Sequence, residues 1–294
     1  MTPSTTKTFG YQETPRSPAT QQSKVAAAFD AVAPRYDVTW THSVVGRIQR
    51  ESVWRAIDGV FMPGGQILDL GCGTGIDAAY LARAGHQIHA IDLSPAMLQS
   101  ARRRLNGEGL TNEVTLELGA LEDLPQLTEL RPFDGAISNF GAINCVNNLR
   151  EVALRLAELI RPGGRLVICS IGRFCVWESL WYLVHARPGK AFRRWSGSAA
   201  AEVGRNGVQG SGAGGSHFEV FYPTVAEIES AFAERFRLLQ FRSIGIFVPP
   251  SYAESWARVA PALFRRLGRL DSIIGAWPGL RAIGDHRLLI LERS

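Results

Sequence analysis

The glycine-rich stretch at residues 66–75 constrains the fold of this chain more than any other segment. It reads Gln-Ile-Leu-Asp-Leu-Gly-Cys-Gly-Thr-Gly, so a short apolar strand runs directly into a loop with alternating glycines. Helical spacing of apolar residues begins immediately afterwards, at Ile76. Glycines let the backbone turn sharply and approach a ligand closely, and the free N–H groups of a helix start attract anionic groups. The pattern predicts a strand–loop–helix unit that holds a ligand.

An acidic residue at the end of the next apolar run indicates what kind of ligand this is. Asp92 lies 21 residues after Gly71. A carboxylate at this place in a βαβ unit can accept hydrogen bonds from the hydroxyls of a ribose. A dinucleotide fingerprint would need its third glycine three residues after the second, but that position, counted from Gly73, is Ile76. The sequence therefore predicts a nucleoside ligand with a spacing that does not fit NAD.

Three stretches resemble the class I S-adenosylmethionine (SAM) methyltransferases. Ile67-Leu-Asp-Leu-Gly-Cys-Gly-Thr-Gly75 resembles their first motif, and Ile91-Asp-Leu-Ser-Pro-Ala-Met-Leu98 resembles their second. Phe29-Asp-Ala-Val-Ala-Pro-Arg-Tyr-Asp37 is similar to the N-terminal signature of the ubiquinone/menaquinone C-methyltransferase-like branch. The resemblance covers roughly residues 24–170. It implies S-adenosyl-L-methionine as the cofactor and S-adenosyl-L-homocysteine as its product.

Alternating strand and helix patterns predict an α/β fold with a mostly parallel sheet. Apolar runs favour strands at 66–70, 87–91, 114–118, 133–138, 164–170, 236–247 and 286–292, and helical spacing favours 75–84, 95–105 and 148–160. The resemblance implies a Rossmann-like sheet of seven strands, of which the last two form an antiparallel pair. Helical insertions are expected after the fifth and sixth strands.

We expect a single methyltransferase domain at 23–294, preceded by a polar, disordered segment at 1–22. Its cofactor half spans 23–170. The insertions at 171–222 and 251–284 are expected to shape the acceptor site, the first as a lid with a mobile stretch from Gly204 to Ser216. Gly- and Ser-rich stretches do not form packed elements.

The resemblance also implies a set of cofactor contacts. Gly71 and Gly73 should bring backbone against the methionine part and the ribose, with Asp92 on the ribose hydroxyls. Ala120 stands where the family has an acidic residue for the adenine amine, which puts that contact in doubt. The expected cofactor-binding residues are Tyr36, Asp69, Gly71, Cys72, Gly73, Asp92, Leu93, Met97, Ala120, Leu121 and Asn139.

Catalysis of methyl transfer needs a base only where the acceptor must lose a proton. The best candidate is His217, which follows the glycine-rich stretch, and Tyr222 is the next. A surface or structural histidine is the competing interpretation. Asn144 and Cys145 are further candidates for the acceptor pocket. The histidines at 86 and 89 do not converge with a cysteine or carboxylate cluster, so no metal site is expected.

Composition is that of an ordinary enzyme, with 46% hydrophobic residues and a net charge of +5. Three lysines leave 29 of the 32 basic residues as arginine, a skew that by itself does not predict nucleic-acid binding. No apolar run approaches the ~20 residues that cross a bilayer, and the N-terminus lacks an apolar signal core. We expect a cytoplasmic protein whose four cysteines are reduced thiols.

The acceptor is the least determined part of the hypothesis. The first insertion offers an aromatic wall with nearby arginines, formed by Trp177, Trp181, Tyr182, Phe192, Trp195, Arg187, Arg193 and Arg194. This favours a small, aromatic or hydrophobic acceptor methylated by in-line SN2 displacement. Two alternatives stay open: a quinone or lipid methyltransferase in peripheral contact with a membrane through the amphipathic segment 255–274, and a SAM-binding protein without catalysis. The oligomeric state is not predicted.

Overall fold

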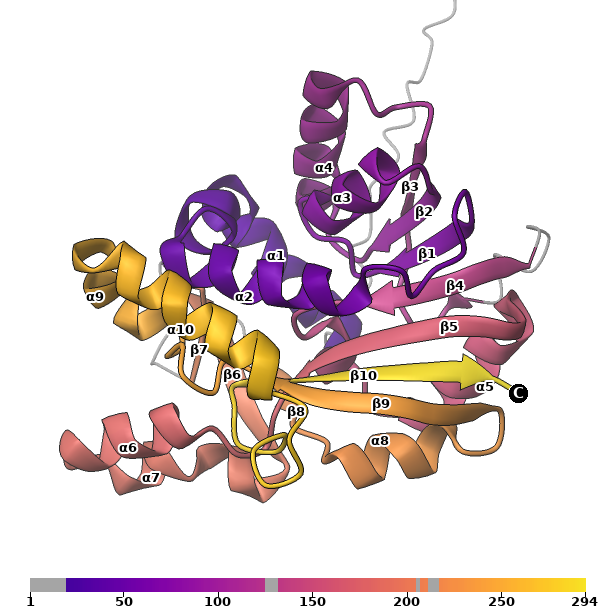
Figure 1. Cartoon of the computed structure of the whole chain (residues 1–294). Coiled ribbons are helices and arrows are strands. Elements are labelled where there is room, and N and C mark those ends of the chain that lie inside the picture. Colours follow the sequence, from indigo (N-terminus) through magenta and orange to yellow (C-terminus); the bar gives the residue numbers. More distant parts are fainter. Residues whose placement is uncertain (1–19, 125–131, 205–206, 211–216) are drawn as a thin grey trace, which may run out of the picture.

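A seven-stranded sheet forms the centre of the computed structural model, which describes residues 20–124, 132–204, 207–210 and 217–294 (Figure 1). The order across the sheet is β3-β2-β1-β4-β5-β10-β9. Strands β1 to β5 run parallel, and β10 runs antiparallel to both β5 and β9. The predicted fold class is therefore confirmed. The strand bounds are β1 Gln66–Leu70, β2 Gln87–Asp92, β3 Val114–Leu118, β4 Phe133–Ser138, β5 Ile160–Ile171, β9 Phe236–Ile244 and β10 His286–Arg293.

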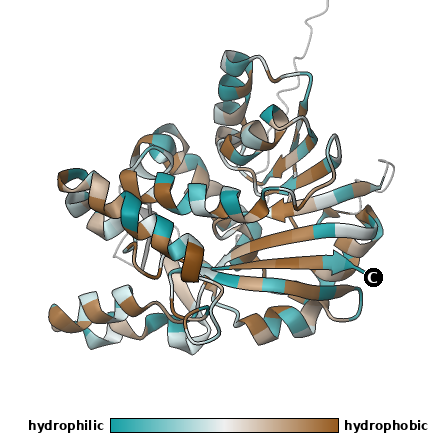
Figure 2. Cartoon of the chain, in the orientation of Figure 1, coloured by the Kyte–Doolittle hydropathy of each residue, from teal (hydrophilic) through white to brown (hydrophobic). Residues whose placement is uncertain are grey.

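Helices cover both faces of this sheet, and the alternation of side chains along each strand explains why. In β1, Ile67 packs with helices α2, α3 and α4 on one face, whereas Leu68 packs with α5 and α8 on the other. Apolar residues run along β5 and β10 between the two layers (Figure 2). The bounds are α2 Val44–Ile57, α3 Ile76–Arg83, α4 Pro95–Glu108, η3 Ala142–Cys145, α5 Leu149–Leu159 and α8 Val225–Phe232.

Two helix starts are determined by local capping. The Ser94 hydroxyl accepts a hydrogen bond from the Met97 N–H, and Pro95 occupies the first position of α4. The side chain of Thr224 accepts from the Glu227 N–H, and the Glu227 carboxylate in turn accepts from the Thr224 N–H.

The N-terminal helix α1 (Gln21–Tyr36) begins earlier than expected. Thr20 caps it by accepting a hydrogen bond from the Ser23 N–H, so residues 21 and 22 belong to the helix and not to the predicted segment 1–22. A π-helical turn, η1 (Asp37–Thr41), follows it directly. The remainder of the predicted segment, 1–19, lies outside the described residues.

The first insertion is only partly helical, which corrects the expectation for 171–222. It comprises α6 Val176–Val184, α7 Pro188–Ala191, η4 Arg193–Ser196, β6 Ser198–Gly204, β7 Gly207–Gly210 and β8 Phe218–Phe221. The three strands form a second sheet in the order β7-β6-β8. Part of the expected mobile stretch is thus a strand, and its residues 205–206 and 211–216 lie outside the described part of the chain.

This small sheet packs on α1 because the strand β8 alternates apolar and polar side chains. Phe218 and Val220 are buried beside Val25 of α1, and the rings of Phe29 and Phe218 lie 6.0 Å apart. The Gln21 side chain pairs with the backbone of Glu219, donating to its carbonyl at 2.6 Å and accepting from its N–H at 3.1 Å. The first insertion therefore holds α1 in place.

The second insertion is helical, as predicted, but its helix is interrupted. It comprises η5 Ser251–Ala253, α9 Glu254–Val259 and α10 Pro261–Ile274. Pro261 lacks an N–H and so starts a new helix rather than continuing α9. The buried side of this segment packs on α2, where Phe264 and Ala257 meet Val45 and Ile48.

Candidate functional site

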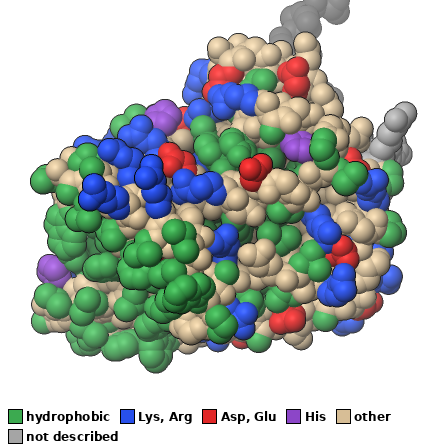
Figure 3. All heavy atoms as spheres, viewed as in Figure 1, with side chains coloured by type: hydrophobic (Ala, Val, Ile, Leu, Met, Phe, Trp, Pro, Cys, Tyr) green, Lys and Arg blue, Asp and Glu red, His purple; other side chains and the backbone are tan. Residues whose placement is uncertain are grey.

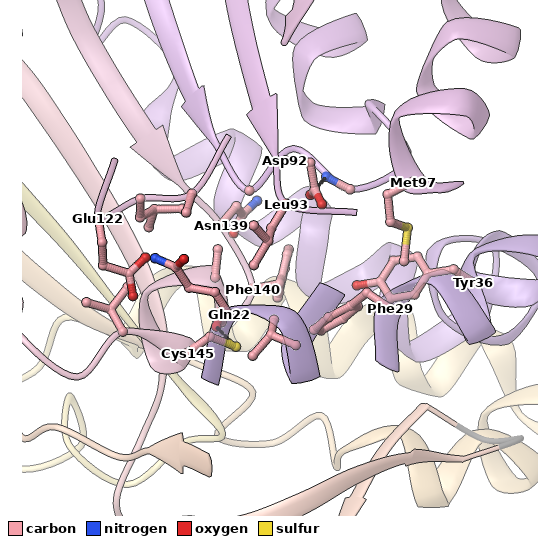
Figure 4. Close-up of a pocket in the computed structure, with 18 residues that line it drawn as sticks. Gln22, Phe29, Tyr36, Asp92, Leu93, Met97, Glu122, Asn139, Phe140 and Cys145 are labelled. Carbon is pink, nitrogen blue, oxygen red and sulfur yellow. Dashed lines mark hydrogen bonds between the residues drawn. The ribbon is translucent and has the colours of Figure 1, made fainter. Parts of the chain in front are cut away.

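A pocket opens beyond the carboxyl ends of β1, β2, β3 and β4, under helix α1 (Figure 4). Its volume is about 730 Å³ with the open mouth included. This is where open α/β sheets bind ligands. Its lining comprises Gln22, Val25, Phe29 and Tyr36 of α1, then Gly71, Gly73, Asp92, Leu93, Met97, Ala120, Leu121, Glu122, Asn139, Phe140, Gly141, Ala142, Cys145 and Val146.

The glycines of the first loop are required by close approach as well as by conformation. Gly71 has φ +74°, and a Cβ there would lie 2.4 Å from the Cβ of Ala142, so a side chain would clash with the floor of the pocket. Gly73 has φ +54°, and a Cβ there would meet no atom within 4 Å. The backbone at Gly73 is therefore open to a ligand.

Asp92 stands at the end of β2 with its carboxylate held by backbone donors. Gly73 donates its N–H to Oδ2 at 2.7 Å, and Ser94 donates its N–H to Oδ1 at 2.8 Å. Burial raises the pKa of Asp92 to about 6, although these two hydrogen bonds act in the opposite direction. Figure 4 shows the carboxylate within the pocket, where its remaining lone pairs can accept from hydroxyl groups.

Two aspartates of the N-terminal signature fasten the cover of the pocket. Asp30 accepts from the Ser94 hydroxyl at 2.6 Å and from the Ala96 N–H at 3.1 Å. Asp37 accepts from the Thr74 hydroxyl at 2.6 Å and pairs with Arg104 at 2.6 Å. The signature thus joins α1 and η1 to both loops that surround Asp92, a role that sequence reasoning did not assign.

A buried polar network lies behind the pocket and orients Asn139. Asp77 forms an ion pair with Arg50 and accepts from Trp54 Nε1 at 2.7 Å and from Asn139 Nδ2 at 3.0 Å. The amide oxygen of Asn139 is buried and has no partner among the described residues. Because its nitrogen is committed to Asp77, this oxygen is a preset acceptor for a ligand donor.

Most of the predicted cofactor residues meet in this pocket, but two do not line it. Asp69 is buried behind the loop, where burial and the neighbouring Asp77 raise its pKa well above the usual range. Cys72 is packed among apolar side chains on one face of the sheet, and burial raises its pKa as well. The other predicted residues are all in the lining.

Sequence reasoning missed Glu122, which lines the pocket two residues after Ala120. Burial raises the pKa of Glu122, and a hydrogen bond from the Gln22 side chain acts against this rise (Figure 4). The loop after β3 therefore places a carboxyl group in the pocket, two residues after the position where the family has its acidic residue. Val25 and Phe29 were also missed, although their spacing of four marks one face of α1.

The structure does not bring the two predicted catalytic residues to the pocket lining. Tyr222 is buried among Val25, Phe218 and Val220, with the Arg194 guanidinium 5.7 Å from its ring centroid. His217 is exposed just before β8. Tyr222 belongs to the cluster formed where the small sheet packs on α1, and neither residue is among those that line the pocket.

Asn144 is structural, whereas Cys145 does line the pocket. Asn144 donates through Nδ2 to the carbonyls of Ile171 and Phe221 and accepts from the Ile171 N–H at 2.8 Å. It therefore joins η3 to β5 and β8. Burial raises the pKa of Cys145 to about 12, so its thiol stays protonated at neutral pH.

The residues of the expected aromatic wall do not line the pocket, and Trp181 instead packs the two insertions together. Trp181 stacks on Tyr252 at 5.0 Å, and Trp177 Nε1 donates to the Ile246 carbonyl at 2.7 Å. Two of the three arginines expected near the acceptor form ion pairs: Arg194 pairs with both Glu178 and Asp285, and Arg193 pairs with Glu178. These ion pairs hold the first insertion in place and leave neither Arg193 nor Arg194 free for an acceptor.

Within the described residues, no group of three or more His, Cys, Asp or Glu side chains could hold a metal ion. No described helix is long and apolar enough to cross a membrane. The cysteines at 72, 145, 169 and 175 are all free thiols.

Comparison with known families and proteins places this geometry in context. Residues 67–164 match the family described as "Methyltransferase domain". A demethylmenaquinone methyltransferase from Clavibacter sepedonicus is 38% identical over 149 residues, which cover 50% of this chain and 58% of the relative. The one from Symbiobacterium thermophilum is 30% identical over 196 residues, covering 60% of this chain and 76% of the relative. The match thus spans little more than half of the first relative's length.

Solved structures share the fold at low sequence identity. The CcbJ methyltransferase from Streptomyces caelestis superposes with a TM-score of 0.58 at 15% identity, covering 91% of this chain and 98% of that chain. A putative SAM-dependent methyltransferase from Listeria monocytogenes gives 0.56 at 14% identity, covering 83% and 99%. At these identities the likeness concerns the fold alone.

Proposed function

Since the chain belongs to the class I SAM-dependent methyltransferases, in the ubiquinone/menaquinone C-methyltransferase-like branch, we propose that it methylates a small hydrophobic or aromatic acceptor held under α1. The observation that carries this proposal is the lining of the pocket. Apolar side chains from α1, such as Val25 and Phe29, line this pocket together with Gly71, Gly73 and Phe140. Such a lining suits a small apolar molecule.

The residues present fit the cofactor of this enzyme family. Asp92 would accept from the ribose hydroxyls, and the unpartnered amide oxygen of Asn139 would accept from the ammonium group of the methionine part. Leu93 and Met97 would flank the adenine. Glu122 would take the adenine amine in place of the acidic residue that position 120 lacks.

Bound SAM would supply an electrophilic methyl group for in-line displacement by the acceptor's nucleophile, with S-adenosylhomocysteine as the leaving group. The chain contributes placement and exclusion of water. Asp30 and Asp37 hold α1 across the pocket, so that both reactants would share one dry space. Placement of this kind can supply roughly 7–11 kcal/mol of the barrier.

The titratable side chains of the lining are poorly suited to remove a proton from the acceptor. Burial raises the pKa of Tyr36 and of Cys145 to about 12, so both groups keep their protons at neutral pH. Asp92 is committed to the ribose and Glu122 to the adenine. We therefore propose that the acceptor ionises by its own acidity, as a phenol-like or activated carbon acid does.

Replacement of His217 by alanine should leave turnover within about twofold, because this residue is not in the pocket lining and a lost base would lower it by about 10²–10⁴-fold. Turnover should instead rise with pH through the pKa of the acceptor. The measurement is the pH–rate profile of wild type and His217→Ala, with Tyr222→Phe as a parallel variant. A loss of a hundredfold in His217→Ala would restore this histidine as the base.

Cofactor affinity should fall below about pH 6, because only ionised Asp92 accepts two hydroxyl hydrogen bonds and its pKa in the free protein is about 6. The sign follows from the direction of this shift: the contact is present above pH 6 and is lost as the pH falls through it, by about tenfold per unit. Calorimetry with S-adenosylhomocysteine between pH 5 and about pH 8 measures this slope. Asp92→Asn, which does not titrate, should bind weakly and without the slope; an equal slope in both proteins would contradict the assignment.

Turnover with a panel of acceptors tests the proposed function. The panel comprises a demethylmenaquinone analogue with a short side chain, a catechol and a small polar amine, each incubated with methyl-labelled SAM. We expect label on the aromatic acceptors. The quinone analogue is included because the curated relatives are named demethylmenaquinone methyltransferases. Label on the amine alone would contradict the proposal, and cofactor binding without turnover on any acceptor would favour the non-catalytic alternative.

A further inference from the structure

Large apolar side chains are exposed along one side of the molecule where the two insertions meet. Figure 3 shows hydrophobic side chains gathered over α6, α9 and α10. Val259 is 87% exposed, Val184 73% and Ile273 69%. We call this surface the apolar face and define it by Leu180, Val184, Trp256, Val259, Leu263 and Ile273. Monomeric proteins seldom expose a contiguous surface of this kind without an interaction to cover it.

The apolar face is continuous across two segments that are distant in sequence. Trp181 of α6 stacks on Tyr252 and meets Trp256 edge-on, with ring centroids 5.0 and 5.4 Å apart. Trp256 nevertheless remains 50% exposed. The face is thus held rigidly from below by a stacked aromatic cluster, while its outer side chains have no cover among the described residues.

The second insertion carries an excess of basic side chains. Residues 251–284 contain five arginines and two acidic residues. Glu254 accepts from the N–H groups of Val44 and Val45 and also pairs with Arg258 at 3.0 Å. Asp271 is buried and accepts from the N–H groups of Phe247 and Val248. Four arginines are exposed on α9 and α10, at Arg258, Arg265, Arg266 and Arg269. A basic row therefore borders the apolar face (Figure 3).

We propose that the apolar face and its arginine row dock on the surface of an anionic lipid bilayer. Exposed Trp, Val, Leu and Ile side chains enter the boundary between headgroups and acyl chains, and arginines beside them bind lipid phosphates. This is the composition of a helix that lies in the plane of a membrane surface. The proposal goes beyond the proposed function, because docking requires neither cofactor nor acceptor.

A second copy of the chain fits this surface less well. A two-fold contact through the apolar face would bring the same arginine row of both copies together. Glu254 is already paired with Arg258, and Asp271 is buried, so neither would offset the charge of Arg265, Arg266 and Arg269. A nucleic acid would meet the arginines but would leave the apolar face in water. An anionic bilayer satisfies both the charge and the apolar side chains.

Vesicle co-sedimentation of the full chain tests the proposal. Vesicles of phosphatidylcholine and phosphatidylglycerol, at about two to one, should retain the protein, with affinity falling at least about tenfold on pure phosphatidylcholine or on raising NaCl from about 0.1 M to about 1 M. Equal binding to both lipids, or binding to neither, would overturn the proposal.

Two variants separate the apolar and charged contributions. Val259→Glu with Leu263→Glu should lower binding to anionic vesicles by about tenfold or more, and Arg265→Gln with Arg266→Gln and Arg269→Gln should remove the preference for anionic lipid. Matched controls lie elsewhere on the surface: Met62→Glu, at an apolar side chain 61% exposed, and Arg102→Gln with Arg103→Gln on α4.

Both controls should bind vesicles as wild type does. If the controls lost as much vesicle affinity as the test variants, binding would not be specific to the apolar face. Affinity for S-adenosylhomocysteine, measured on every variant, should be unchanged and reports that the fold is intact. Light scattering tests the alternative that a second copy of the chain covers the apolar face. The proposal would be overturned if the wild-type protein were a dimer that does not bind vesicles and if Val259→Glu dissociated this dimer.

Discussion

Asp92→Ala should remove most of the affinity for SAM and S-adenosylhomocysteine while leaving the protein folded. The carboxylate would accept two charge-assisted hydrogen bonds from the ribose, each contributing roughly 1.5–3 kcal/mol, so the dissociation constant should rise by about 10²–10⁴-fold. The N–H groups of Gly73 and Ser94 also lose their acceptor, which loosens the loop. Burial without a ligand raises the pKa of Asp92, so removing the carboxylate should not destabilise the free protein strongly.

Isothermal calorimetry with S-adenosylhomocysteine measures this loss, and circular dichroism checks the fold. Asp123→Ala is the matched control, because Asp123 is an exposed aspartate beside the same pocket edge and does not line it. The control should bind as wild type does. A folded Asp92→Ala protein with nearly unchanged affinity would show that the ribose is held elsewhere.

Asp77→Ala should lower the free energy of unfolding by about 3–5 kcal/mol, the usual effect of leaving one partner of a buried ion pair uncompensated. Arg50 would keep its charge in a buried position, and Trp54 Nε1 and Asn139 Nδ2 would both lose their acceptor. Cofactor affinity should fall as well, since nothing would then orient the Asn139 amide.

Urea denaturation of wild type and variant measures the stability change. Glu234→Ala is the control, because the ion pair of Glu234 with Arg150 is exposed on both sides and should contribute at most about 1 kcal/mol. A change in Asp77→Ala as small as that of the control would mean that the buried network is dispensable.

The cofactor half was predictable because its signals are local. A glycine loop between a strand and a helix, a carboxylate at the next strand end and a Ser-Pro helix start each act within a few residues. Consequently the strands and helices of this half and the position of Asp92 in the pocket agree with expectation.

The differences between the predicted cofactor residues and the residues that line the pocket also have local causes. Glu122 was overlooked because the loop after β3 delivers its carboxyl group two residues later than the motif expects. Asp69 and Cys72 belong to the motif but lie behind the loop, since side chains alternate between the two sides of the strand and loop.

The sequence by itself determined the fold class, the cofactor and most of the predicted residues that line the pocket, because these depend on contacts between near neighbours in the chain. Only the tertiary structure decided what covers the pocket and what covers the insertions. Phe218 packs on Phe29 across 189 residues, so the segment with His217 and Tyr222 contacts α1 without lining the pocket. Trp181 stacks on Tyr252 and does not line the pocket either. Apolar contacts are non-directional, so the sequence of an apolar segment does not specify its partner. Which distant element buries it depends on how all the elements pack together.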